Sequence, residues 1–383
     1  MAKRTNDYEF KTKDKIWWWG SNLLGFVASI VLVVSVIISL PFRRYESIVL
    51  RYAIRIIFFC IVLGVIFAAF LYYSPGTAAN FGNETQYLYI NRGETIYDVG
   101  YNLQRMGAIS SEFNFMLFAK LLGHSKKIKA GRYAIEPKYS MYNIFNSITK
   151  GITIPFNVTI LEGLTIKGIA EILTRNLDLE AEEFLLECSN RQLLDSLMIP
   201  ADDLEGYLFP DTYNFFYDES PRSVIRKMIC QFFANLPDSF EEKAKELSLD
   251  FHEAVTMASL IEKEAMLNSE RPIISAVYHN RLKIRMRLQC DPTVIYARGG
   301  LKRPLYYSDL QFDSPYNTYL IYGLPPGPIC SPGKASLEAA VNPAASDYLF
   351  FVARGDGTHI FTRSNDEHNN AKNLIKREKI FAN

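Results

Sequence analysis

The chain has almost no excess charge of either sign. Its 383 residues carry 42 Lys and Arg against 41 Asp and Glu, which leaves a net charge of +1. Proteins that bind nucleic acids normally present a clear excess of basic side chains. We therefore expect no nucleic-acid partner for this protein.

The sequence also lacks the spacings that hold metals and cofactors. Its five histidines and five cysteines form neither CxxC pairs nor histidine pairs at ligand spacing. His252 and Glu253 begin like an HExxH zinc motif, but Thr256 occupies the place of the second histidine. There is no GxSxG elbow and no GxxxxGK[ST] phosphate loop. We predict no metal and no cofactor, and the sequence leaves open whether two of the last four cysteines form a disulfide.

What is present begins with an apolar run, IIFFCIVLGVIFAAFLYY, from Ile56 to Tyr73. A run of this length without charge is long enough to cross a bilayer as a helix. Arginines precede it at 43, 44, 51 and 55, and no Lys or Arg follows before Arg92. The positive-inside tendency then places the rest of the chain outside the cell (inner) membrane, facing the periplasm or cell exterior.

A second apolar stretch lies upstream, from Leu23 to Phe42. If both stretches span, the N-terminus faces outside, against the preference of the Lys and Arg that precede them. Residues 1–73 are therefore predicted to be a membrane anchor, and the choice between one and two spanning helices stays open. A short linker, rich in turn residues, is expected over residues 74–86.

Residues 87–180 contain a weak internal repeat. YLYINRGETIYDVGYNL, from Tyr87, aligns with VTILEGLTIKGIAEIL, from Val158. Each copy predicts a strand, a glycine turn, a threonine that caps a helix, and an amphipathic helix. Such units resemble LysM-type glycan-binding modules, and a structural platform without a ligand is the alternative. Together with a mixed α/β catalytic domain over 181–383, this predicts an α+β protein.

A single helix is expected from about Phe251 to Leu282, and it carries an anomalous carboxylate. At about 100° per residue, Glu264 shares the apolar face with Met257, Leu260 and Ile261, whereas Glu262 lies on the opposite side. Burial of a carboxyl raises its pKa, and a protonated carboxyl near neutral pH can act as a general acid. The alternatives are a Glu264 paired with Arg281 or Arg285, or one at a solvent-facing edge.

The blocks NRLKIRMRLQCDPTVIYA and SPYNTYLIYGLPPGPICSPG follow this helix. The first block places arginines, Gln289, Asp291 and Thr293 close to apolar residues. The second alternates tyrosines and Asn317 with a run of Pro and Gly, which suits a sugar-binding cleft as well as a long structural loop. The candidates for orienting a sugar are Gln289, Asp291, Thr293, Tyr316 and Asn317.

Five ordered blocks resemble the endolytic murein transglycosylase family, also called the YceG-like family. They are EGYLFPDTY, MASLIEKEA, RLQCDPTVIYA, YNTYLIYGLPPGPICSPG and HNNAKN. The resemblance implies an enzyme that cuts the MurNAc–GlcNAc β-1,4 bond within nascent peptidoglycan strands and leaves 1,6-anhydro-MurNAc ends. It implies that Glu264, the second Glu of EKE, is the catalytic acid and base. Peptidoglycan glycan strands, the membrane and peptidoglycan synthases are the expected partners. Members usually have one anchor helix, and the present chain departs from this pattern because it has two apolar stretches near its N-terminus.

Two rival functions remain at this point. One is a glycoside hydrolase in which a second carboxylate, Glu205, Asp211 or Asp291, activates water. The other is a glycan-binding scaffold without catalytic activity. The mass of the product distinguishes the first from a transglycosylase, because an anhydro end is one water lighter than a reducing end.

Overall fold

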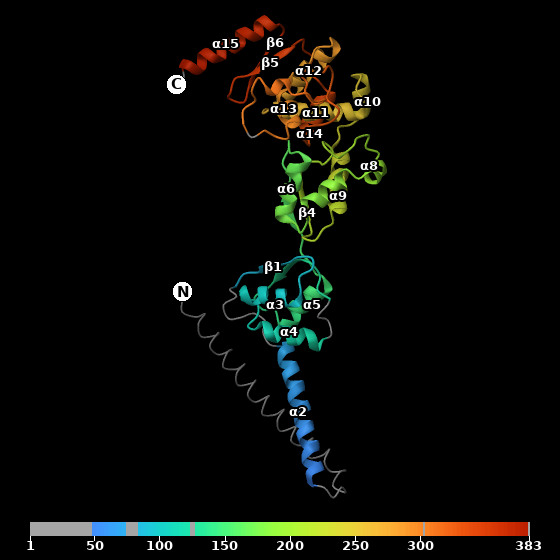
Figure 1. Cartoon of the computed structure of the whole chain (residues 1–383), viewed down its shortest axis with the longest axis vertical. Coiled ribbons are helices and arrows are strands. Elements are labelled where there is room, and N and C mark those ends of the chain that lie inside the picture. Colours follow the sequence, from blue (N-terminus) through green and yellow to red (C-terminus); the bar gives the residue numbers. More distant parts are fainter. Residues whose placement is uncertain (1–47, 74–82, 123–126, 302, 382–383) are drawn as a thin grey trace, which may run out of the picture. The chain divides into compact units, whose positions relative to one another are not determined.

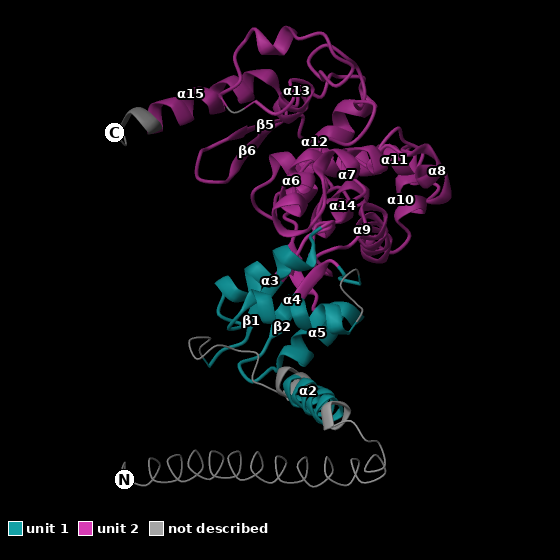
Figure 2. Ribbon diagram, turned by 60° about the horizontal axis from the view of Figure 1, so that its bottom comes forward, with its two compact units in different colours: residues 1–88, 94–129, 133–152 teal, residues 89–93, 130–132, 153–383 magenta. Residues whose placement is uncertain are grey.

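The computed structural model describes residues 48–73, 83–122, 127–301 and 303–381. The chain forms two compact units (Figures 1 and 2). The first comprises residues 1–88, 94–129 and 133–152, and the second comprises residues 89–93, 130–132 and 153–383. The predicted apolar stretch from 23 to 42 lies outside the described residues.

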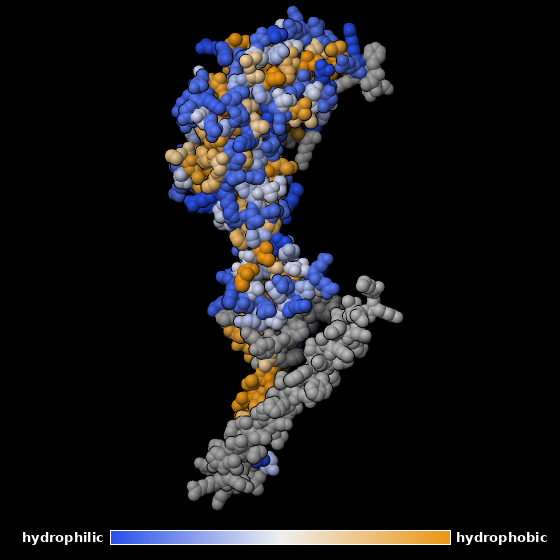
Figure 3. Space-filling model, turned by 180° about the vertical axis from the view of Figure 1, so that it is seen from behind, coloured by the Kyte–Doolittle hydropathy of each residue, from blue (hydrophilic) through white to orange (hydrophobic). Residues whose placement is uncertain are grey.

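The first described element of the first unit is helix α2 (Ile48–Tyr73), which contains the predicted anchor run. Several of its apolar side chains, including Ile56 and Phe59, are exposed, and they form apolar surface along the described part of α2 (Figure 3). Within the part of the chain that the structure describes, no helix combines the length and apolarity needed to cross a membrane.

The first copy of the repeat has the predicted local structure. Strand β1 (Gln86–Ile90) is followed by a turn at Gly93, whose φ of 86° suits glycine, and then by helix α3 (Ile96–Arg105). Thr95 caps α3 by accepting from the backbone N–H of Asp98, whose side chain returns to the Thr95 backbone. This region also contains α4 (Glu112–Leu121), β2 (Gly131–Ile135), which pairs with β1, and α5 (Met141–Lys150).

The second copy of the repeat belongs to the second compact unit. Strand β3 (Phe156–Thr159) pairs antiparallel with β4 (Thr212–Phe215), with Val158 opposite Tyr213. Helix α6 (Ile166–Asn176) is capped by Thr165, as the repeat predicts. The second compact unit takes in residues from 153 onward, and the predicted domain boundary at residue 180 stays a prediction. The sequence repeat does not reveal that β3 pairs with a strand downstream.

The second unit is a mixed α/β structure dominated by helices. Helix α11 (Phe251–Glu264) is central and packs against α14 (Lys334–Val341), α12 (Arg271–Lys283) and α10 (Phe240–Glu246). Strands β5 (Phe350–Ala353) and β6 (His359–Thr362) form an antiparallel hairpin. The remaining elements are α7 (Ala181–Cys188), α8 (Arg191–Ser196), α9 (Pro221–Asn235), α13 (Asp291–Ala297), η2 (Asp309–Gln311) and α15 (Asn365–Phe381). All five cysteines lie among the described residues, and none of them is in a disulfide.

The prediction of one long helix from 251 to 282 was wrong. The structure has α11 and α12, separated by an irregular segment over 265–270. Pro272 lies in the first turn of α12, where its missing N–H has no consequence. Inside a continuous helix the same proline would remove a hydrogen bond and its ring would clash with the preceding turn. The break makes Glu264 the last residue of α11.

Candidate active site

Both ends of helix α11 are defined by local backbone and side-chain geometry. Asp250 caps its N-terminus and forms a capping box with Glu253. The helix stops at Glu264 because Ala265 adopts an extended backbone, with φ −82° and ψ 123°. A carboxyl at the C-terminal end of a helix lies against the negative end of the helix dipole, which disfavours its ionised form. The position of Glu264 therefore favours protonation even before burial is considered.

Glu264 opens into a cavity of about 720 Å³. The cavity is lined from elements far apart in the sequence, including α12, the start of α13, the β5–β6 hairpin and α15. The lining residues that bear on the chemistry are Glu264, Arg281, Gln289, Asp291, Tyr319 and His359. This volume is in the range of small-molecule sites, and it admits part of a polymer.

Burial raises the pKa of the half-buried Glu264 carboxyl, and the negative charge of Asp291 acts in the same direction. Hydrogen bonding from Cys290 and Tyr278, together with His359, partly offsets this increase. The Tyr278 hydroxyl donates to Glu264 Oε1 over 3.1 Å. The raised pKa expected from the helical position of Glu264 is thus confirmed in direction.

The alternative in which an arginine neutralises Glu264 does not hold among the described residues. Arg281 directs its guanidinium to backbone carbonyls, with Nε donating to Leu349 over 2.6 Å and Nη1 to Leu288 over 2.7 Å. Glu264 forms no ion pair with Arg281 or Arg285 in the described part of the chain. Its carboxyl is therefore available to a ligand in the cavity.

Glu262, two residues earlier, has a different environment. Its side chain is 6% exposed and accepts from Arg271 Nη2 over 2.9 Å, and Arg271 is equally buried. The backbone N–H of Gly333 donates to its second oxygen over 3.0 Å. Glu262 thus joins α11 to α12 and to the segment before α14, and its carboxylate is fully occupied. The two glutamates of the EKE motif have separate tasks.

Of the five predicted sugar-orienting residues, Gln289 and Asp291 lie in the cavity with Glu264. Gln289 has a left-handed backbone, with φ of 50°, which is uncommon for a residue other than glycine. Such strained positions concentrate at functional sites. Asp291 accepts a short hydrogen bond from the Tyr319 hydroxyl, which also lines the cavity.

The other three lie elsewhere. Thr293 and Asn317 are fully buried, and their side chains bond to the protein itself. The Thr293 hydroxyl pairs with Thr318 over 2.9 Å, and Asn317 Nδ2 donates to the carbonyls of Leu310 and Phe312. Tyr316 lines a second cavity. Thr293 and Asn317 hold the loops in place, and the geometry gives none of the three a contact with the Glu264 cavity.

Several cavity residues were not predicted from the sequence. Tyr319 stands in a block that was singled out, but the tyrosines there could not be ranked by spacing alone. Tyr306 and Tyr307 lie in an irregular loop, and His359 is the first residue of β6. No local signal marks these residues, because only the tertiary structure brings them to the cavity of Glu264.

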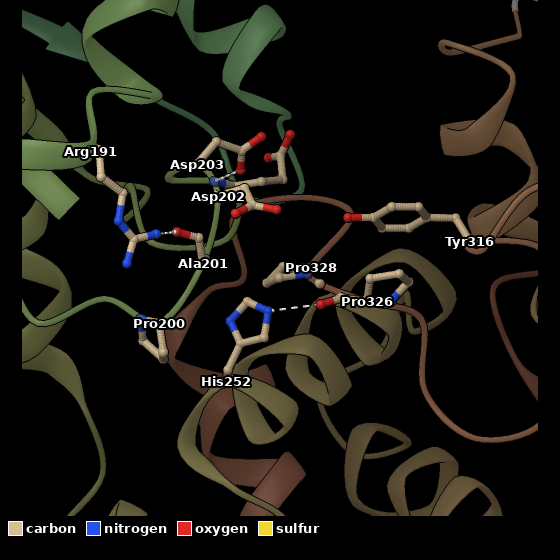
Figure 4. A pocket seen from close by; sticks show the side chains of 11 residues that line it. Arg191, Pro200, Ala201, Asp202, Asp203, His252, Tyr316, Pro326 and Pro328 are labelled. Atoms are coloured by element: carbon tan, nitrogen blue, oxygen red, sulfur yellow. Dashed lines mark hydrogen bonds between the residues drawn. The ribbon is translucent and has the colours of Figure 1, made fainter. Parts of the chain in front are cut away.

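A second cavity, of about 380 Å³, is lined by Tyr316 and His252 (Figure 4). Glu205, another of the carboxylate candidates, also lines it. Glu205 is buried and accepts from the backbone N–H of Ile166, the first residue of α6, over 3.1 Å. His252 is fixed here by the Tyr207 hydroxyl and the Pro326 carbonyl. Glu205 therefore acts as a cap for α6, and it does not share a cavity with Glu264.

Replacement of Glu205 by Gln should flatten the pH dependence of stability. Burial raises the pKa of Glu205 from 4.5 to about 8. Because the folded pKa is the higher one, its contribution to stability is complete below the unfolded value and is lost as pH rises through about 8. The loss is on the order of a few kcal/mol. Thermal unfolding should show a falling midpoint from about pH 5 to pH 8 for the parent chain and a smaller fall for Glu205→Gln, with exposed Glu171→Gln as the control.

The second unit thus defines a mixed α/β protein with a cavity into which a carboxyl of raised pKa opens from the end of a helix. A family model described as the YceG-like family matches residues 88–374. An endolytic murein transglycosylase of Bacillus subtilis (strain 168) is 35% identical over 299 residues, covering 74% of this chain and 82% of that protein. The crystal structure of a YceG-like protein from Listeria monocytogenes covers 76% of this chain and 99% of its own, with a TM-score of 0.53 and 34% identity.

A longer relative is the endolytic murein transglycosylase of Streptococcus pneumoniae serotype 2 (strain D39), which is 29% identical over 309 residues. The match covers 73% of this chain and 56% of the pneumococcal protein, so it spans little more than half of that relative. The chain belongs to the YceG-like family. By this membership it is an enzyme, a lytic transglycosylase.

Proposed function

We propose that this protein cuts peptidoglycan glycan strands internally, at the MurNAc–GlcNAc β-1,4 bond, and leaves 1,6-anhydro-MurNAc ends. The observation that carries the proposal is the position of Glu264, a carboxyl of raised pKa that opens into a cavity and forms no ion pair among the described residues. The names of its relatives support peptidoglycan as the substrate.

In the proposed reaction Glu264 acts twice. The protonated carboxyl gives its proton to the glycosidic oxygen as the bond from that oxygen to C1 of MurNAc breaks. The 6-hydroxyl of the same MurNAc then bonds to C1, and its proton passes to the Glu264 carboxylate. Atoms and charge balance without water, and the acid is regenerated. An intramolecular nucleophile that is already oriented lowers the barrier by several kcal/mol, on the order of 7 or more.

Gln289, Asp291 and Tyr319 are the residues that we assign to orienting the sugar. Their amide, carboxylate and hydroxyl groups lie in the same cavity as Glu264 and match the donors and acceptors of a glycan. Tyr306 and Tyr307 add ring faces at the cavity, and Tyr307 is 89% exposed. Amphipathic rings of this kind suit the faces of sugar rings.

We further infer that the enzyme works on the outer side of the cell membrane. The charge-free run from Ile56 to Tyr73, preceded by arginines, supports this location. Exposed apolar side chains on the described part of α2 are consistent with a lipid environment. An enzyme held there would meet newly made strands beside peptidoglycan synthases, and its cuts would end strand elongation.

The hydrolase alternative depends on a second carboxylate near Glu264. Glu205 caps α6, and Asp211 is an exposed residue that binds Gln231. Asp291 alone among the three shares the cavity with Glu264, so it is the one that could activate water. The alternative therefore reduces to a single residue.

Asp291→Asn should retain transglycosylase activity and continue to give anhydro ends. We expect a loss in rate of about tenfold or less, because the change weakens the hydrogen bond from Tyr319 but leaves Glu264 intact. Removal of the Asp291 charge also lowers the pKa of Glu264, so activity should decline at a lower pH than in the parent. Mass spectrometry of the digested glycan, at a series of pH values, measures the rate at which anhydro ends form and its dependence on pH. Reducing ends from the parent enzyme, lost in Asp291→Asn, would instead establish a hydrolase.

A further inference from the structure

Tyr278 contacts the Glu264 carboxyl from the protein interior and not from the cavity. Its side chain is 1% exposed and it does not line the cavity. Its hydroxyl donates to Glu264 Oε1 over 3.1 Å, and its ring packs edge-on against Phe351, with centroids 5.9 Å apart. A substrate in the cavity therefore meets Glu264 without contacting Tyr278.

We propose that Tyr278 is a positioning residue, which holds Oε1 of Glu264 so that Oε2 carries the proton given to the glycan. This proposal rests on the proposed function of Glu264. The terminal torsion of a glutamate is broad and roughly two-fold, so a free carboxyl would rotate between orientations. An oxygen that accepts a hydroxyl hydrogen is a poor place for a second proton. The hydrogen bond from Tyr278 thus fixes the plane of the carboxyl and decides which oxygen is the acid.

The position of Tyr278 supports this assignment. It lies on α12, whose Arg271 is bound to Glu262 of α11, so the two helices are joined close to Glu264. Phe351 from β5 packs against its ring and limits the movement of the hydroxyl. The buried tyrosine is rigid, and it therefore sets the geometry of the more exposed carboxyl.

Other titratable or charged groups also influence Glu264. They are Arg281 on α12, Cys290 and Asp291 at the start of α13, Tyr319 in the loop after η2, and His359 on β6. Asp291 opposes ionisation of Glu264, whereas Cys290 and His359 favour it. Cys290 and Tyr278 both hydrogen-bond to Glu264, and of the two donor groups the hydroxyl is chemically the better donor. A Tyr278→Phe substitution removes that bond while it leaves these five groups and the ring in place.

The test is the pH profile of Tyr278→Phe in the full-length chain, with uncrosslinked peptidoglycan strands as substrate. Loss of a hydrogen bond to the carboxylate makes ionisation less favourable and raises the pKa of Glu264. Activity that requires protonated Glu264 should then persist to higher pH, with the alkaline limb moved up by about one pH unit. We expect kcat to fall about tenfold with KM unchanged, because the carboxyl loses its fixed orientation but the cavity does not change.

Two further variants make the outcome decisive. Tyr207→Phe is the matched control, since Tyr207 is equally buried and its hydroxyl bonds to His252, away from Glu264. It should leave the alkaline limb unchanged. Replacement of Tyr278 by 3-fluorotyrosine keeps the shape of the side chain and makes its hydroxyl a stronger donor. The alkaline limb of the pH profile should therefore move to lower pH. This second variant tests the proposal even if Tyr278→Phe folds poorly.

An alkaline limb that stays at its parental position in both Tyr278 variants would overturn the positioning role. That result would leave the proposed function intact, provided that the parent still makes anhydro ends and Glu264→Gln does not. Absence of anhydro ends from the parent would contradict the proposed function itself, whatever the Tyr278 variants do.

Discussion

Glu264→Gln is expected to abolish formation of anhydro-ended glycan while the chain remains folded. General acid–base catalysis by a positioned side chain contributes on the order of 10²- to 10⁴-fold, and here one group performs both steps. Glutamine keeps the shape of the side chain and can still accept from Tyr278, but it has no proton to transfer. Uncrosslinked glycan incubated with the variant should show no new anhydro ends by mass spectrometry.

The matched control for this experiment is Glu246→Gln, which makes the same chemical change at an exposed position on α10. It should retain the activity of the parent. Near-normal anhydro product from Glu264→Gln would remove the mechanism. A parent chain that binds glycan without cutting it, and a Glu264→Gln variant that binds equally well, would favour a scaffold.

Arg271→Met is expected to destabilise the second unit strongly. Arg271 and Glu262 are both about 6% exposed, and their ion pair links α11 to α12. Removal of one partner leaves a buried carboxylate without its cation, at a cost of about 3–5 kcal/mol. The Arg271 Nε bond to Ser336, which reaches α14, is lost as well. Urea unfolding of the full-length chain should show a clear fall in the transition midpoint.

The double variant Arg271→Met and Glu262→Met should recover much of this loss. Two apolar side chains of similar volume leave no unpaired charge, and such replacements are often neutral or stabilising. If Arg271→Met alone changes the unfolding free energy by less than about 1 kcal/mol, the pair is not a structural link. Recovery of stability without recovery of activity would show that the ion pair also places Glu264, two residues away.

Much of the local structure was predictable from the sequence. The caps Thr95 and Thr165 and the glycine turns before them are signals within a few residues, and the structure confirms them. The mixed α/β class of the second unit was also predicted. The membrane anchor and the LysM-like character of residues 87–180 remain predictions. Partner strands such as β3 and β4 were not foreseen, because pairing joins segments that are far apart in the sequence.

Helical periodicity by itself predicted a raised pKa for the Glu264 carboxyl, because the face of a helix depends only on residue spacing, and the direction is confirmed. It did not predict that the Glu262 side chain is also buried, since that burial comes from the ion pair with Arg271 on another helix. The tertiary structure alone decided what surrounds it. In one continuous helix, Tyr278 would stand about 21 Å from Glu264 along the axis. The break before Pro272 instead lets α12 fold back, so the hydroxyl reaches the carboxyl. Likewise, packing turned Thr293 and Asn317 inward and left Gln289 and Asp291 at the cavity, because neither the short helix α13 nor the loops beside it have a periodic pattern long enough to predict these directions.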